Sequence, residues 1–307
     1  CAVTAEAEHK ARKATRHAVN LPGRPVVVVT GCAAVVARDR MTALSDRVVV
    51  ESEKENVAAR VRELLGQPIA EVAHVFDERT FRTRRMLKIE DGCDAFCAYC
   101  IVPYARGVPR SVALSEVIAT AGRLVGQGVA EIVLTGINIG RYADPDGAGL
   151  AEVVDAVAAT GVARMRLSSI EPLDLDDRLL GVLARHDNVC PHLHVPLQSG
   201  SDRVLEAMGR AYTVAEFERR IASARDAVPG LAVTTDVMVG FPGESDDDAR
   251  ATADAVERVG FSKLHVFRYS PREGTRAATM PDQIAASISS ARAETLRVIG
   301  DALRDSF

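Results

Sequence analysis

From Met86 onward, short apolar strands alternate with amphipathic helices, and this rhythm leaves few folds open to the chain. Strands that are separated by helices are joined by right-handed crossovers and lie parallel in one sheet. We therefore expect an α/β protein with six βα units. The expected strands are 86–89, 131–135, 163–167, 192–195, 232–239 and 263–267, and the expected helices include 114–124, 150–158, 214–227 and 245–259.

The chain is long enough for two domains, or for one barrel with a smaller partner, because it has 307 residues and is 47% hydrophobic. Residues 1–82 predict a small, incomplete α/β unit with a helix over 5–19 capped by Thr4, a strand over 25–30 and a helix over 57–65. Residues 83–281 contain the six βα units, and 282–307 predict a final helix.

Several classes of protein are excluded by composition. The net charge of −4 argues against a protein that coats nucleic acid by bulk electrostatics, although a local basic groove stays open. No run of 18 apolar residues occurs, so we expect no membrane partner. The charged opening stretch lacks the apolar core of a signal peptide, which favours a cytoplasmic location. Because the first residue is Cys1 rather than Met, we expect a missing upstream segment.

Each unusual motif of the second unit follows one of the expected strands. In parallel α/β folds the carboxyl ends of the strands meet at one edge, where functional groups gather. We therefore expect one site built from these loops. They are 91–93, 135–138, 168–171, 198–201, 240–244 and 269–271.

Three thiols crowd into the first of these loops, at Cys93, Cys97 and Cys100. Zinc sites commonly use paired C-x2-C knuckles with four ligands, and here the sequence offers no second pair and no nearby His. A cubane iron–sulfur cluster held by three thiolates leaves one iron open to a small molecule. The spacing therefore favours an iron–sulfur cluster over zinc, and over three ordinary buried thiols.

With Tyr99, the triplet resembles the C-x3-C-x-aromatic-C signature of radical S-adenosylmethionine (SAM) enzymes. The resemblance implies a partial (β/α)6 barrel and a [4Fe-4S] cluster whose open iron chelates S-adenosylmethionine. It also implies an electron donor, such as a flavodoxin or ferredoxin, and a 5′-deoxyadenosyl radical as the first product. Cys93, Cys97 and Cys100 would be both the metal ligands and the catalytic residues.

The same resemblance assigns cofactor-binding roles to other strand-end residues. Gly136, Ile137 and Asn138 would offer free backbone groups to the methionine amino group. Tyr99 would line the adenine site, and packing in the core is the alternative for this side chain.

Further cofactor contacts are expected on the following strands. Ser168, Ser169 and Glu171 offer hydroxyls and a carboxylate for ribose, although the two serines suit local backbone hydrogen bonds equally well. Gln198 and Gly240 belong to loops that resemble those approaching the nucleoside in this family, and turn chemistry alone is their alternative.

Two cysteines outside the barrel, Cys1 and Cys32, resemble ligands of the auxiliary cluster of methylthiotransferases, a branch of the same family. That resemblance implies a second [4Fe-4S] cluster in the full-length protein, with one further ligand upstream of Cys1. Residues 1–82 would be the truncated methylthiotransferase domain, and 282–307 would lead to an RNA-binding domain that is absent here. Cys190 has no partner in the sequence and is expected to be a buried thiol.

Four strings resemble the branch that modifies N6-threonylcarbamoyladenosine in tRNA. The resemblance implies transfer of a methylthio group to C2 of that nucleoside at position 37, beside the anticodon. Siblings that act on isopentenyladenosine in tRNA, or on an aspartate of a ribosomal protein, are the alternatives within the family. The strings are CIVPYARG (100–107), LTGIN (134–138), RLSSIEP (166–172) and HVPLQSGS (194–201).

The expected partner is therefore the tRNA anticodon loop, with no role for DNA. Two basic clusters are candidates for phosphate contacts, and solvated surface is their alternative. From another class, a zinc-stabilised nucleic-acid-binding module without catalysis would also explain cysteines together with basic residues. The clusters are Lys10, Arg12, Lys13 and Arg16, and Arg82, Arg84, Arg85 and Lys88.

Overall fold

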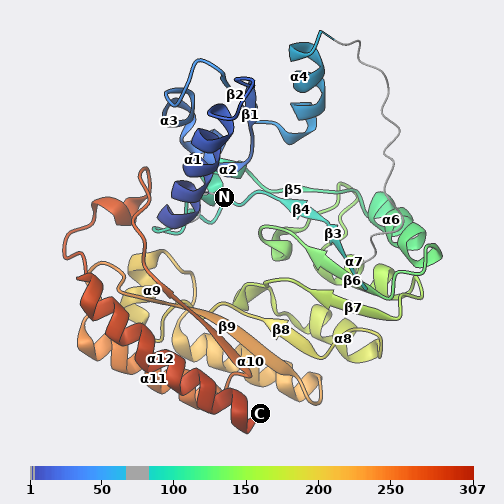
Figure 1. Ribbon diagram of the computed structural model, residues 1–307. Coiled ribbons are helices and arrows are strands. Elements are labelled where there is room, and N and C mark those ends of the chain that lie inside the picture. Colours follow the sequence, from blue (N-terminus) through green and yellow to red (C-terminus); the bar gives the residue numbers. More distant parts are fainter. Residues whose placement is uncertain (1, 3, 67–82) are drawn as a thin grey trace.

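The computed structural model describes residues 2, 4–66 and 83–307, so Cys1, Arg82 and the expected boundary at 82/83 lie outside the described residues. Figure 1 shows a small amino-terminal unit above a curved layer of strands with helices on its outer side. Among the described residues, no helix is both long and apolar enough to cross a membrane.

Six parallel strands form the larger unit, as the sequence predicts. They lie in two sheets of three, in the orders β3-β6-β7 and β8-β9-β10. Isolated bridges between Met165 and Val189 and between Ser169 and His194 join β7 to β8. The outer strands β3 and β10 do not pair in the described part of the chain, so the barrel is open. The strands are β3 Arg84–Lys88, β6 Glu131–Thr135, β7 Arg164–Leu167, β8 His192–His194, β9 Ala232–Val239 and β10 Lys263–Arg268.

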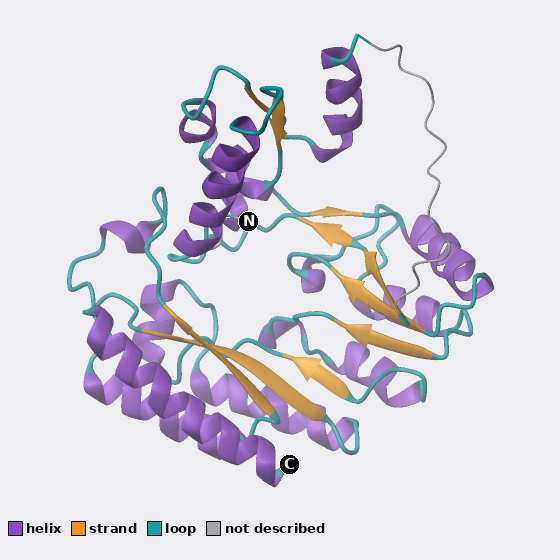
Figure 2. Ribbon diagram, viewed as in Figure 1, coloured by secondary structure: helices purple, strands orange, loops and turns teal. Residues whose placement is uncertain are grey.

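Helices cover the outer face of these strands (Figure 2). The predicted helices are confirmed to within a few residues, because their apolar positions recur at helical spacing, as Val117 and Ala121 do. Two more helices, α8 and α9, follow loops whose Asp176 and Ser201 side chains cap them. The helices are α6 Leu114–Gly126, α7 Leu150–Ala158, α8 Asp177–Arg185, α9 Asp202–Met208, α10 Val214–Ala227, α11 Asp246–Val259 and α12 Ala286–Ser306.

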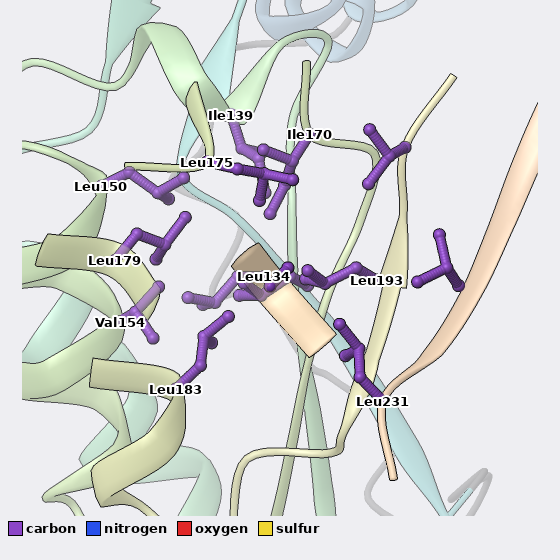
Figure 3. Packing of buried hydrophobic residues seen from close by; sticks show 14 of the residues in the cluster. Leu134, Ile139, Leu150, Val154, Ile170, Leu175, Leu179, Leu183, Leu193 and Leu231 are labelled. Carbon is purple, nitrogen blue, oxygen red and sulfur yellow. The ribbon is translucent and has the colours of Figure 1, made fainter. Parts of the chain in front are cut away.

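The main core lies between the strands and this helical layer. Leu134 of β6 and Leu193 of β8 are buried among side chains from the helices, including Val154 and Leu179 (Figure 3). A second, smaller cluster beneath the cysteine loop contains Ala98 and Phe241, and Tyr99 packs against it. The core-packing alternative for Tyr99 is thus the arrangement found.

The amino-terminal unit combines short helices with two parallel strands. Thr4 caps α1, because its Oγ1 accepts a hydrogen bond from the N–H of Ala7 at 3.1 Å. The first strand is shorter than the predicted 25–30, since Gly31 turns the chain into α2 with a φ of 87°. The elements are α1 Ala5–Val19, β1 Val27–Val29, α2 Cys32–Val36, α3 Arg38–Thr42, β2 Val48–Val50 and α4 Val57–Leu64, with β1 and β2 parallel.

A buried ion pair connects this unit to the barrel. Glu8 of α1 and Arg272, in the loop after β10, are only 4% and 6% exposed and pair directly. Arg40 of α3 lies 3.4 Å from both Glu8 and Glu273. The two units are therefore held together by charges that their contact shields from solvent.

Candidate active site

The cysteine loop runs from β4 (Glu90–Asp91) to α5 (Val102–Arg106) and is fixed by its own backbone. The N–H of Ala98 donates to the carbonyl of Met208 at 2.7 Å, and the carbonyl of Ala98 accepts from the N–H of Ala277 at 2.8 Å. Gly92 has a φ of 103°, and a Cβ there would lie 2.2 Å from the carbonyl oxygen of Val108. Neighbouring segments therefore set the shape of the loop.

The three predicted thiols are all half-buried in this loop. Burial raises the pKa of Cys93, and it raises the pKa of Cys100 to about 11. Within the described residues, the three sulfurs do not form a group in which all ligand atoms lie within 4.8 Å of one another. A single tetrahedral zinc ion needs sulfurs about 3.8 Å apart, whereas a cubane binds each thiolate at a separate iron. The three thiols as described therefore do not have the geometry of a tetrahedral zinc site.

A cavity of about 340 Å³ opens beside Cys97. It brings together three of the predicted residues, Cys97, Asn138 and Glu171, from the loops after three different strands. Its volume suits a small-molecule cofactor. The cavity is lined by Asp94, Ala95, Cys97, Asn138, Arg141, Glu171, Leu173, Asp174, Gly209, Arg210, Ala211 and Tyr212.

Arg210 is the main cavity residue that the sequence analysis missed. Its guanidinium pairs with Glu171, donates to the sulfur of Cys97 at 3.3 Å and lies 5.1 Å from the centre of the Tyr212 ring. Burial alone would lower the pKa of Arg210, but the charges of Tyr212 and Glu171 hold it above its ordinary value. The one sequence feature that could have indicated Arg210 is the preceding Gly209. This glycine ends α9 in a left-handed conformation and turns the chain toward the cavity.

A second missed residue, Glu90, holds the loop after β6. Its side chain is fully buried, and Oε2 accepts hydrogen bonds from the N–H groups of Ile137 and Asn138, both at 2.9 Å. The N–H groups of Ile137 and Asn138 are therefore occupied by Glu90, and the groups of this loop that could accept from a methionine amino group are its carbonyl oxygens. Gly136 permits the arrangement, because a Cβ there would lie 2.7 Å from Glu90 Oε2. The side chain of Asn138 in turn lowers the pKa of Cys93, against the larger effect of burial.

The remaining predicted cofactor residues are not among the described residues that line the cavity. Ser168 has a buried hydroxyl with no hydrogen-bond partner in the described part of the chain. Ser169 bridges to His194, and the N–H of Gln198 donates to the carbonyl of Asp236 at 2.9 Å. Gly240 has a φ of 75°, and a Cβ there would lie 2.6 Å from Cβ of Ser289 in α12.

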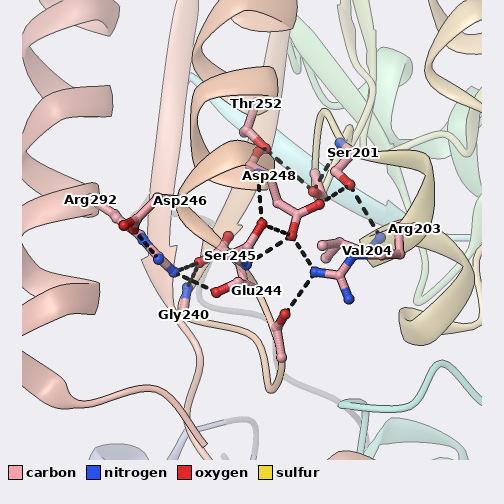
Figure 4. Close-up of polar contacts among 12 residues, drawn as sticks. Ser201, Arg203, Val204, Gly240, Glu244, Ser245, Asp246, Asp248, Thr252 and Arg292 are labelled. Atoms are coloured by element: carbon pink, nitrogen blue, oxygen red, sulfur yellow. Dashed lines mark hydrogen bonds and ion pairs between the residues drawn. The ribbon is translucent and has the colours of Figure 1, made fainter. Parts of the chain in front are cut away.

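Two polar networks hold the loops after β8 and β9 (Figure 4). Glu244 Oε2 accepts from the N–H of Gly240 at 2.6 Å and from Arg292 of α12 at 2.7 Å. Asp248 of α11 accepts from the hydroxyl of Ser201 at 2.6 Å and pairs with Arg203. These contacts link the 198–201 and 240–244 loops to the helical layer.

Cys32 lies apart from the three thiols, at the start of α2. It lines a separate cavity of about 300 Å³ between the amino-terminal unit and the barrel. Basic and acidic side chains line the same cavity in similar numbers, and Asp91 pairs with both Lys88 and Arg106 at 3.1 and 3.3 Å.

Comparison with known proteins identifies the chain's family. Residues 87–256 match the radical SAM superfamily. The threonylcarbamoyladenosine tRNA methylthiotransferase MtaB of Bacillus subtilis is 39% identical over 100% of this chain and 72% of its own length. The chain belongs to the radical SAM methylthiotransferases. The MtaB enzyme of Thermotoga maritima is 37% identical over 97% of this chain and 71% of its own length. A tRNA-2-methylthio-N(6)-dimethylallyladenosine synthase of Moorella thermoacetica is 41% identical over 77% of this methylthiotransferase.

Solved structures agree on the fold of this methylthiotransferase. The radical SAM methyltransferase TsrM of Kitasatospora setae, with cobalamin and a [4Fe-4S] cluster bound, has a TM-score of 0.64 and 16% identity, covering 88% of this chain and 62% of TsrM. Methylornithine synthase has a TM-score of 0.51 and 14% identity over 96% of this chain and 77% of its own. As a radical SAM enzyme, the protein uses an iron–sulfur cluster together with S-adenosylmethionine.

Proposed function

We propose that this methylthiotransferase transfers a methylthio group to C2 of N6-threonylcarbamoyladenosine at position 37 of tRNA. The observation that carries the proposal is 37–39% identity to two enzymes named for that nucleoside, across 97–100% of the chain. The sequence strings that resemble this branch include 100–107 and 134–138, which adjoin the cysteine loop and the Asn138 loop of the cavity.

Cys93, Cys97 and Cys100 hold the cluster in this proposal, and S-adenosylmethionine occupies the cavity beside Cys97. When bound, the cluster supplies the electron that cleaves S-adenosylmethionine. Arg210 places a positive charge between Cys97 and Glu171, where it offsets negative charge on the thiolate side of the cavity. Glu171 is positioned for the ribose hydroxyls, and Asn138 lies against Cys93.

We propose in addition that Cys1 and Cys32, with a ligand from upstream, bind a second [4Fe-4S] cluster. Cys32 is half-buried beside a cavity at the contact between the amino-terminal unit and the barrel, which supports this placement. Arg110 lines the same cavity and is proposed as a phosphate contact for tRNA. A flavodoxin or ferredoxin is the proposed electron donor.

Anaerobic reconstitution with iron and sulfide tests the catalytic part of the proposal. We expect about four irons per three-cysteine site and formation of 5′-deoxyadenosine on reduction with dithionite. Cys97→Ala should abolish 5′-deoxyadenosine formation, while Cys190→Ala, which removes a buried thiol outside the cavity, should retain it. Tight zinc binding without iron would instead support the non-catalytic nucleic-acid-binding module.

Substrate identity is tested separately, by offering tRNA with threonylcarbamoyladenosine, tRNA with isopentenyladenosine, and the ribosomal protein to the full-length enzyme. Mass spectrometry of the isolated nucleosides should show a methylthio group on the first tRNA only. A gain on either other substrate would contradict the proposed substrate and leave the enzyme class standing.

A further inference from the structure

The inner face of the barrel carries a cluster of metal-ligating side chains apart from the cysteine loop. On β8, β9 and β10, the core residues Leu193, Val237 and Leu264 pack with the helical layer. Because side chains alternate along a strand, the residues next to them face the other side of the sheet. Those residues are His194, Asp236 and His265.

Their geometry is that of a ligand set around one small ion. Asp236 Oδ1 lies 3.2 Å from His194 Nε2 and 3.3 Å from His265 Nδ1. All three ligand atoms lie within 4.8 Å of one another, and no other such group occurs among the described residues. Zinc bonds to nitrogen and oxygen of about 2.0–2.1 Å give tetrahedral edges of about 3.3–3.4 Å. The two measured edges match this value closely.

A neighbouring hydroxyl orients the first histidine. His194 Nδ1 lies 2.9 Å from Thr234 Oγ1, which also lies 3.3 Å from His192 Nε2. Metal-binding histidines commonly donate their second ring N–H to such a partner. With the Nδ1–H of His194 donated to Thr234, the lone pair of Nε2 points at the carboxylate of Asp236. In that tautomer the Nε2 lone pair and the carboxylate oxygen, 3.2 Å apart, are two ligand atoms that one metal ion can share; in the other tautomer Nε2–H donates to Asp236 directly.

We propose that His194, Asp236 and His265 bind one divalent transition-metal ion of the zinc type inside the barrel. Imidazole and carboxylate donors suit zinc and similar ions. The side chains are 14%, 27% and 42% exposed, so solvent reaches the three residues and water can serve as a further ligand. His194 also bridges in the sheet to Ser169, so the ion lies next to the strand that leads to Glu171. This site does not depend on the proposed tRNA substrate.

Zinc binding to the whole chain tests the proposal. Equilibrium dialysis with metal analysis should show one fewer tightly bound zinc ion per chain in Asp236→Asn and in His265→Gln than in the unmodified chain. The affinity at this site should fall at least about tenfold in each variant. His186→Gln is the matched control, because His186 also contacts an aspartate, Asp155, at 2.6 Å but has no second histidine beside it. Zinc bound by cysteines is the same in all four proteins and cancels in the comparison.

Two further readouts separate loss of a ligand from loss of the fold. Cobalt is added to the unmodified chain and to Asp236→Asn, and the visible spectrum of the variant is subtracted from that of the unmodified chain. The difference spectrum should contain no thiolate-to-cobalt charge-transfer band. Zinc should raise the midpoint of thermal unfolding of the unmodified chain and of His186→Gln by more than that of Asp236→Asn, in which only cysteine-bound zinc contributes. Equal zinc stoichiometry in all the variants, or a cobalt difference spectrum with thiolate character, would overturn the proposal. So would an unmodified chain that binds no zinc outside its cysteines, which would mean that protons on the histidines neutralise Asp236.

Discussion

The carboxylate of Glu90 fixes the loop after β6 by binding backbone N–H groups of that loop. Burial raises the pKa of Glu90, while the two N–H groups that its carboxylate accepts from favour the ionised form, and charge-assisted hydrogen bonds are roughly twice as strong as neutral ones. We expect Glu90→Gln to loosen the 136–138 loop by about 1–1.5 kcal/mol, which corresponds to about tenfold faster amide exchange at Ile137 and Asn138. Hydrogen–deuterium exchange measures this, with the exposed Glu116→Gln on α6 as control. Unchanged exchange at both amides would contradict the assigned role.

Asp174 gives the cavity a dependence on pH. Burial, with the nearby charge of Glu171, raises the pKa of this carboxyl to about 6, from an ordinary value of 3.8. A raised pKa means that the folded state prefers the protonated form, so stability falls as the pH rises from about 4 through about 6. Asp174→Asn should therefore gain stability relative to the unmodified chain over this interval and hold the gain above it. Urea unfolding at several pH values measures the difference, and a difference that is independent of pH would refute it.

Among single residues, the three cysteine ligands can be predicted from local spacing, because all three fall within eight residues of the sequence. Arg210 could not be predicted in the same way, because 113 residues separate it from Cys97 and only the folded chain brings the two together. Glu90 is likewise missed, since nothing in its local sequence indicates that its carboxylate will meet the loop after β6.

At the scale of elements, strands and long helices follow the predicted ranges because each has its own apolar pattern. The strands 131–135 and 232–239 and the helices 150–158 and 214–227 are found at the predicted bounds. The helix α9 is short and directly follows a loop, so its pattern covers too few positions to be distinguished from the loop.

The ion pair between α12 and the loop after β9 gives a test at this scale. Glu244 is 3% exposed, and removal of Arg292 would leave its carboxylate buried without that partner. Arg292→Met should therefore destabilise the protein by about 3–5 kcal/mol, measured by denaturant unfolding. On the same helix, Arg297→Met removes a half-exposed pair with Glu294 and should cost less than about 1 kcal/mol. Equal losses in the two variants would contradict a special role for Arg292.

For the whole molecule, the sequence predicts six parallel strands but not how the two units dock. Docking depends on Glu8 and Arg272, which are 264 residues apart and whose burial only the assembled units create. Whether the sheet closes also depends on long-range geometry, and the pairing of β7 with β8 through isolated bridges has no signature in the sequence.

Glu8→Gln should weaken the contact between the two units, because it leaves Arg272 buried beside a neutral side chain. We expect a loss of about 3–5 kcal/mol of stability and faster protease cleavage between the units. Glu6→Gln on the same helix removes an exposed pair with Lys10 and should change neither. If Glu8→Gln behaves like Glu6→Gln, the docking must rest on contacts other than the buried charges.

The hydrogen bonds from both sides of Ala98 have a consequence for how the loop binds a cluster. The cysteine loop is tied to the end of α9 and to the segment around Ala277 by these backbone groups, and the side chains of Arg210 and Arg276 hold it as well. The backbone hydrogen bonds use no cysteine sulfur, so they order the loop independently of its ligand atoms. We expect this ordering to lower the entropy cost of bringing three thiols to one cluster.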